Sequence, residues 1–118
     1  MTVLDIKNLL ECEVLWGEDE LGREVHTACG SDMMSDVLAF VKDQSVLVTG
    51  LVNTQTIRTA MMMDIVCIVF VRGKIPAGEV IQIAADNDIV LLATEKLMFE
   101  ACGKLYAAGL SGGGLKIE

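Results

Sequence analysis

The sequence has few basic residues. Its 9 Lys and Arg residues are outnumbered by 17 Asp and Glu residues, which gives the 118-residue chain a net charge of -8. Nucleic acids and anionic membranes are bound by surfaces rich in lysine and arginine, so we expect neither as a partner. The acids are concentrated early, because residues 1–59 hold 10 acidic and 4 basic residues whereas residues 60–118 hold 7 and 5.

Long apolar runs are also lacking. The most apolar stretch covers residues 65–71, between Asp64 and Arg72. A membrane-spanning helix needs about 20 apolar residues, so no membrane span is predicted. Asp5 interrupts the N-terminal segment and no long apolar run follows it, which predicts no signal peptide. Together these features predict a cytoplasmic protein.

The residues that usually hold metals are sparse. His26 is the only histidine, and the four cysteines include no CxxC pair. Zinc and iron–sulfur sites normally use ligands that are close in sequence, so we predict no metal and no other cofactor. The cysteines are interpreted as reduced and structural. Asp32 and Asp36, one helical turn apart, are the alternative, because such a pair can share a metal.

Familiar catalytic motifs are missing as well. The sequence contains no GxxxxGK[ST], GxGxxG or GxSxG segment. A Ser–His–Asp triad would have to use His26, which we place within a strand. We therefore predict that the protein is not an enzyme. The alternative is a small phosphotransfer enzyme that uses Ser31, Ser35 or Asp32.

Hydrophobic residues are plentiful, at 53%, so a chain of this length can form one domain with a buried core. Strands and helices alternate from Cys29 onward, which predicts a parallel sheet with right-handed crossovers. The predicted fold is α/β, a three-layer α/β/α domain with a mainly parallel central sheet over residues 1–110, followed by a flexible tail at 111–118. Apolar spacing predicts helices at 3–10, 31–41, 53–63, 77–86 and 94–108, and strands at 12–16, 24–29, 45–49, 66–71 and 89–93.

Polar residues mark the expected helix starts. Ser31 or Asp32, Asn53 and Thr94 are predicted N-caps, because their side-chain oxygens can accept from the first free N–H groups of a helix. Gly109 is expected to end the last helix. The expected buried stripe of helix 31–41 consists of Met34, Val37, Leu38 and Val41.

Small, polar and cationic residues follow the predicted parallel strands, where open α/β sheets bind their ligands. One interpretation is helix capping and chain turning. The other is an anion-binding site, in which helix N-termini and two cations surround one ligand. Arg72 is the sharpest candidate, because it directly follows the most apolar strand. The ligand-binding candidates are Ser31, Asp32, Thr49, Gly50, Asn53, Arg72, Gly73, Lys74 and Thr94.

Methionines occur in two runs, at residues 33–34 and 61–63. Consecutive helical positions cannot all face the core, so some of these side chains lie near the surface unless a partner covers them. Together with the high apolar content, this predicts a homodimer.

Several segments resemble, in the same order, those of small stand-alone DRTGG-domain proteins. They are GSDMMSDVLA at 30–39, SVLVTG at 45–50, Asn53, VCIVFVRG at 66–73 and LYAAG at 105–109. DRTGG domains are similar to the N-terminal domain of HPr kinase/phosphorylase. The resemblance implies a three-layer α/β fold, frequent dimerisation and no catalysis in the domain itself. Stand-alone members often accompany iron-only hydrogenase and related redox genes in anaerobic bacteria.

These observations favour a non-catalytic regulatory or ligand-sensing domain, a homodimer that binds a small anionic metabolite or nucleotide near Arg72 and Lys74. The alternative is an adaptor that binds a redox or hydrogenase-type protein through its acidic or methionine-rich face. A kinase activity does not follow from the resemblance, because the phosphate loop of HPr kinase lies in its other domain.

Overall fold

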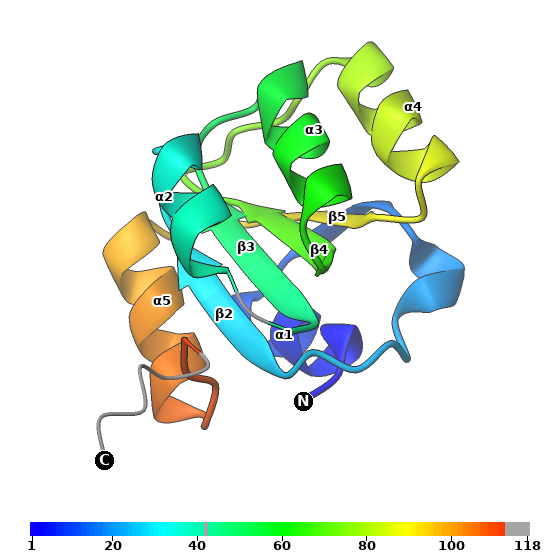
Figure 1. Cartoon of the computed structure of the whole chain (residues 1–118). Coiled ribbons are helices and arrows are strands. Elements are labelled where there is room, and N and C mark those ends of the chain that lie inside the picture. Colours follow the sequence, from blue (N-terminus) through cyan, green and yellow to red (C-terminus); the bar gives the residue numbers. More distant parts are fainter. Residues whose placement is uncertain (42, 113–118) are drawn as a thin grey trace.

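The protein forms a five-stranded sheet covered by helices on both faces (Figure 1). The computed structural model describes residues 1–41 and 43–112. The strand order is β1-β5-β4-β3-β2, with β1 antiparallel to β5 and the other neighbours parallel. The elements are α1 (Val3–Leu10), β1 (Glu13–Trp16), the 3-10 helix η1 (Glu18–Glu20), β2 (Thr27–Gly30), α2 (Met34–Phe40), β3 (Ser45–Thr49), α3 (Thr54–Met62), β4 (Ile65–Phe70), α4 (Gly78–Asp86), β5 (Val90–Ala93) and α5 (Met98–Ala107).

The sheet carries a core on each face, which confirms the predicted three-layer arrangement. Helices α2, α3 and α4 cover one face, and α1 and α5 cover the other (Figure 1). Successive residues of a strand point to opposite faces. Accordingly, Val46 and Val48 pack in the cluster with α1 and α5, whereas Leu47 packs with α2, α3 and α4. All six residues of β4 are buried, as its apolar run without alternation predicts.

The predicted strand at 24–29 is wrong in its bounds, because β2 covers Thr27–Gly30. The preceding residues pair with the N-terminus instead of the sheet. Glu24 forms an isolated bridge with Thr2, and the Val25 N–H donates to the Met1 carbonyl. His26 therefore lies outside the strand, and its Nδ1 is 3.0 Å from Asp43 Oδ2. Apolar alternation alone does not reveal which segment a chain pairs with.

Two predicted helix caps are also wrong. Helix α2 begins at Met34 with Met33 as its N-cap, and α5 begins at Met98 with Leu97 as its N-cap. Thr94, the predicted cap of α5, instead donates its hydroxyl to the Leu10 carbonyl over 2.7 Å. Asn53 does cap α3, because its side chain accepts from the Thr56 N–H.

The predicted buried stripe of α2 is wrong at Leu38 and Val41, and Val41 is only half-buried because it lies at the C-cap beyond the helix. Leu38, expected in the buried stripe of α2, is exposed, whereas Met34 and Val37 are buried. The helix is only seven residues long, so its buried stripe is narrow. Gly109 adopts a left-handed φ of 113° just beyond α5, as expected for a glycine that ends a helix.

The predicted tail at 111–118 lies mostly outside the described residues, which include only Ser111 and Gly112 of it. Ser111 forms a parallel bridge with Thr27, and its carbonyl accepts from the Ala28 N–H at 2.9 Å. The chain therefore runs beside the edge strand β2 as it leaves α5.

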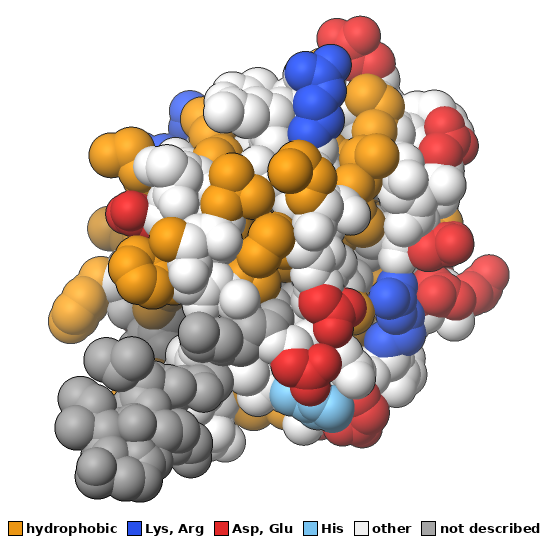
Figure 2. All heavy atoms as spheres, in the orientation of Figure 1, with side chains coloured by type: hydrophobic (Ala, Val, Ile, Leu, Met, Phe, Trp, Pro, Cys, Tyr) orange, Lys and Arg blue, Asp and Glu red, His pale blue; other side chains and the backbone are white. Residues whose placement is uncertain are grey.

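Hydrophobic side chains gather on the side of the molecule that carries α2, α3 and α5, whereas most of the visible acids lie on the opposite side (Figure 2). The exposed side chains include Met33, Met61 and Met62, which confirms that part of the methionine runs reaches the surface. None of the helices in the described part of the chain has the length and apolar character required to cross a bilayer.

Candidate functional site

The carboxyl ends of β3 and β4 lie side by side at one edge of the sheet. Thr49, the last residue of β3, pairs with Phe70, the last residue of β4. The ladder continues for one more hydrogen bond, from the Val71 N–H to the Thr49 carbonyl at 3.0 Å. The residues that follow the two strands are therefore brought together, as the parallel sheet predicts.

A left-handed turn fixes the position of Arg72. Arg72 and Gly73 have φ values of 62° and 67°. Residues other than glycine seldom adopt this left-handed backbone conformation. Two hydrogen bonds hold the turn to the segment after β5, from the Arg72 N–H to the Lys96 carbonyl and from the Gly73 N–H to the Thr94 carbonyl, both at 2.9 Å. The backbone is therefore anchored while the Arg72 side chain is about half exposed.

The Arg72 guanidinium lies against the backbone of Gly50. A Cβ built at Gly50 would overlap with the guanidinium nitrogen Nη2 and would also contact Cζ and Nε. Glycine at this position thus leaves the space that the cation occupies. The guanidinium is thereby held over the end of β3.

The Asp32 carboxylate lies beside the Arg72 guanidinium. Its Oδ1 accepts from the Thr49 hydroxyl at 2.8 Å and from the Gly50 N–H at 2.7 Å. Its Oδ2 lies 3.9 Å from Arg72 Nη2. The Gly50 N–H is the main cause that lowers the pKa of Asp32, and the Thr49 hydroxyl and the charges of Arg72 and Lys74 act in the same direction.

We expect the Asp32 carboxyl to titrate below the usual aspartate pKa of about 3.9. Because its pKa is lowered in the folded state, its stabilising contribution is present above the unfolded pKa and is lost as the pH falls through the folded pKa. Carbon-13 NMR of the Asp32 side chain measures the midpoint directly. Thr49→Val removes the hydroxyl donor and should raise that midpoint, and a wild-type midpoint at or above 3.9 would contradict this account.

The hydroxyl and amide side chains of the other predicted site residues are used in hydrogen bonds within the fold. The Ser31 hydroxyl accepts from the Met33 N–H at 2.9 Å, Asn53 caps α3, and the Thr94 hydroxyl is bound to Leu10. A Cβ at Gly73 would meet the Glu95 carboxylate, so this second acid also lies at the sheet edge. The candidates whose polar groups converge are therefore Asp32, Thr49, Gly50 and Arg72, with the charge of Lys74 near them.

This cluster suits an anion better than a metal ion. Within residues 1–41 and 43–112, no three His, Cys, Asp or Glu side chains gather in a way that would hold a metal. Asp32 already accepts from Thr49 and Gly50. Two cations, Arg72 and Lys74, lie close enough for their charges to act on Asp32, and cations bind anions.

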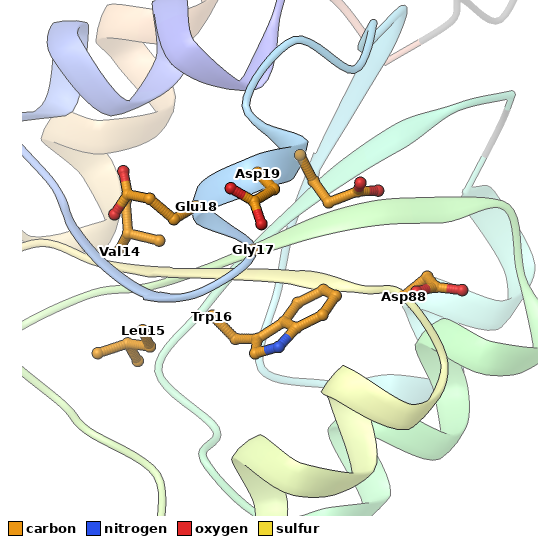
Figure 3. Close-up of a pocket in the computed structure, with 8 residues that line it drawn as sticks. Val14, Leu15, Trp16, Gly17, Glu18, Asp19 and Asp88 are labelled. Carbon is orange, nitrogen blue, oxygen red and sulfur yellow. The ribbon is translucent and has the colours of Figure 1, made fainter.

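A second concave site was missed from the sequence. A cavity of about 450 Å³ lies at the end of β1, and in Figure 3 the Trp16 indole extends toward Asp88. The signal was present in the sequence, because three consecutive acids follow the only tryptophan closely. The cavity is lined by Val14, Leu15, Trp16, Gly17, Glu18, Asp19, Glu20 and Asp88. Its acids repel anions, so it is a different kind of site from the cluster around Arg72.

The sequence was compared with models of known protein families. The family model of the DRTGG domain matches residues 5–108. The chain belongs to the DRTGG domain family. This confirms the resemblance that the segments between residues 30 and 109 indicated, and the fold agrees with it.

A solved structure has the same fold as this DRTGG domain. It is described as the CBS and DRTGG domains of the regulatory region of Clostridium perfringens pyrophosphatase complexed with an activator, diadenosine tetraphosphate. The TM-score is 0.70 at 16% sequence identity, and the match covers 88% of this chain and 45% of that chain. This DRTGG domain thus corresponds to less than half of the solved protein. No curated protein matches its sequence significantly.

The solved structure that shares this fold is itself described as part of a regulatory region.

Proposed function

We propose that this DRTGG domain is a ligand-sensing regulatory domain that binds a small anionic metabolite or nucleotide beside Arg72. The observation that carries the proposal is the guanidinium of Arg72, half exposed and held over Gly50 by an anchored turn. Arginine binds carboxylates and phosphates through two parallel hydrogen bonds. A phosphate is the favoured anion, because the pyrophosphatase region of the same fold was solved with a phosphate-bearing activator.

Asp32 acts in this proposal as an internal anion that the ligand replaces. Its carboxylate accepts from the Thr49 hydroxyl and the Gly50 N–H, both of which a phosphate oxygen can use. Oδ2 lies 3.9 Å from Arg72, beyond a direct hydrogen bond. The cation is therefore free to pair with an incoming phosphate as Asp32 moves aside.

Asp32→Asn is expected to raise the affinity for inorganic pyrophosphate. The substitution removes a negative charge that repels the ligand, and a unit-charge repulsion near the surface is worth about 1 kcal/mol or more at this range, roughly 5-fold in affinity. Isothermal titration calorimetry with pyrophosphate and with ADP, at fixed low salt, measures the change. Asp36→Asn is the matched control, because Asp36 lies in the first turn of α2.

The proposal fails if neither the wild type nor Asp32→Asn binds any phosphate-bearing probe. It also fails if Asp36→Asn raises the affinity as much as Asp32→Asn does, because the gain would then reflect net charge and not the site.

The proposal extends to a homodimer in the cytoplasm. The four cysteines are free in the described part of the chain, which suits a reducing compartment. Exposed apolar side chains on α2, α3 and α5 support self-association.

The alternative function is an adaptor for a redox or hydrogenase-type protein. The acidic cavity beside Trp16 supports it, because an indole face and carboxylates together attract the cationic side chain of another protein. Affinity capture from the native host, compared with Asp19→Lys, tests it. A stoichiometric redox protein that the variant no longer captures would favour the adaptor, whereas equal capture by both forms would exclude this cavity.

A further inference from the structure

The outer face of α5 is unusually apolar for an exposed helix. Phe99 is 91% exposed, Tyr106 is 74% exposed and Leu97, at the N-cap, is 60% exposed. The inner face is occupied by Ala101 and Leu105, which are buried against the sheet. Single exposed apolar residues are ordinary, but three on one short element mark an interaction surface.

This face is also hollowed. A groove of about 610 Å³ runs along it. A Cβ built at Gly103 would meet nothing within 4 Å, so the helix surface is open there. Glycine is a poor helix former, and its presence within α5 permits another helix to approach closely. The groove is lined by Leu97, Phe99, Glu100, Gly103, Lys104 and Ala107.

The positions of these residues make the face complementary to itself. Phe99, Gly103 and Ala107 recur every four residues and form one stripe, with Glu100 and Lys104 on the stripe beside it. A two-fold axis at Gly103 sets two antiparallel α5 helices against each other. It brings Phe99 of one protomer onto Ala107 of its partner, and Glu100 toward Lys104 of its partner.

We propose that a second copy of this chain covers α5, so that the homodimer of the proposed function is formed by an α5–α5 contact. Charge favours this occupant. Each chain has a net charge of -8, so two copies repel each other over most of their surfaces. The groove has one acid, Glu100, and one base, Lys104. Across the two-fold axis each pairs with the opposite charge of the other protomer, so the contact is neutral overall.

Exchanging the charges of Glu100 and Lys104 tests the α5–α5 contact most sharply. Sedimentation equilibrium on the wild type, from low to high micromolar concentration, is expected to give twice the chain mass of 12.7 kDa. Glu100→Lys alone places like charges opposite each other and should weaken the dimer at least 10-fold. The double variant Glu100→Lys with Lys104→Glu restores the pairing and should recover the dimer. Phe99→Glu should also dissociate it, and circular dichroism checks that each variant is folded.

Met62→Glu on α3 is the matched control, because Met62 is exposed on the face that carries α2 and α3. A dimer that Met62→Glu dissociates and Phe99→Glu does not would overturn the α5 contact while leaving the homodimer intact. A monomer at every concentration would overturn both the contact and the homodimer, and anion binding beside Arg72 would still be judged by its own titrations. Failure of the double variant to recover the dimer would contradict the charge exchange.

Discussion

Phe70→Ala is expected to lower the free energy of unfolding by about 3 to 5 kcal/mol, the range found for truncating a large buried aromatic residue. Phe70 is fully buried at the end of the central strand β4, in the core beneath α2, α3 and α4. It pairs with Thr49 on one side and with Ala93 on the other. A cavity here cannot be filled without moving two neighbouring strands.

Urea unfolding followed by circular dichroism measures this change. Domains of this size are stable by about 5 to 15 kcal/mol, so Phe70→Ala should lose a large share of that stability and unfold at a markedly lower urea concentration than the wild type. Met62→Ala is the control, because an exposed apolar side chain should change the stability by less than about 0.5 kcal/mol. A loss below 1 kcal/mol for Phe70→Ala would mean that this core relaxes far more than close-packed interiors do.

Arg72→Ala is expected to weaken pyrophosphate binding at least 10-fold. Hydrogen bonds to charged groups are worth about 1.5 to 3 kcal/mol, and about 1.4 kcal/mol corresponds to a factor of ten. Arg58→Ala on α3 removes the same charge from another exposed position and should change the affinity far less. Calorimetric titration at matched salt compares the two.

Gly50→Ala separates the position of the cation from its charge. The added methyl occupies the space where the guanidinium lies, so Arg72 keeps its charge but must move. The affinity of Gly50→Ala for pyrophosphate should therefore lie between that of the wild type and that of Arg72→Ala. Equal affinities in the wild type and Arg72→Ala would show that the ligand binds elsewhere.

The central strands and their helices were predictable because several local signals agree. The apolar run of β4 and the helix that begins after Asn53 were both predicted correctly. Two interpretations were possible for Ser31, Asp32 and Thr94. A short polar side chain can cap a helix, or it can form a hydrogen bond with a distant backbone group equally well. The Asp32 carboxylate accepts hydrogen bonds from Thr49 and Gly50, and the Thr94 hydroxyl donates one to the Leu10 carbonyl. Only the tertiary structure decides between these choices.

The residues of the candidate site were predictable from the sequence, but the contacts between them were not. The parallel order of β3 and β4 brings Thr49, Gly50 and Arg72 together, as the positions after the strands indicated. The direct hydrogen bonds from Thr49 and Gly50 to Asp32 required the structure. The acidic cavity and the exposed face of α5 were missed, because the sequence does not show which side of an element its neighbours leave uncovered.

Anion binding beside Arg72 can be observed directly by titrating the nitrogen-15-labelled domain with inorganic pyrophosphate and following its backbone amide signals. We expect the largest shifts on the amides of Gly50 and Arg72, and we expect Arg72→Ala to require at least 10-fold more pyrophosphate for the same response. Shifts centred on Trp16 and Glu18, or none at saturating pyrophosphate, would contradict anion binding beside Arg72.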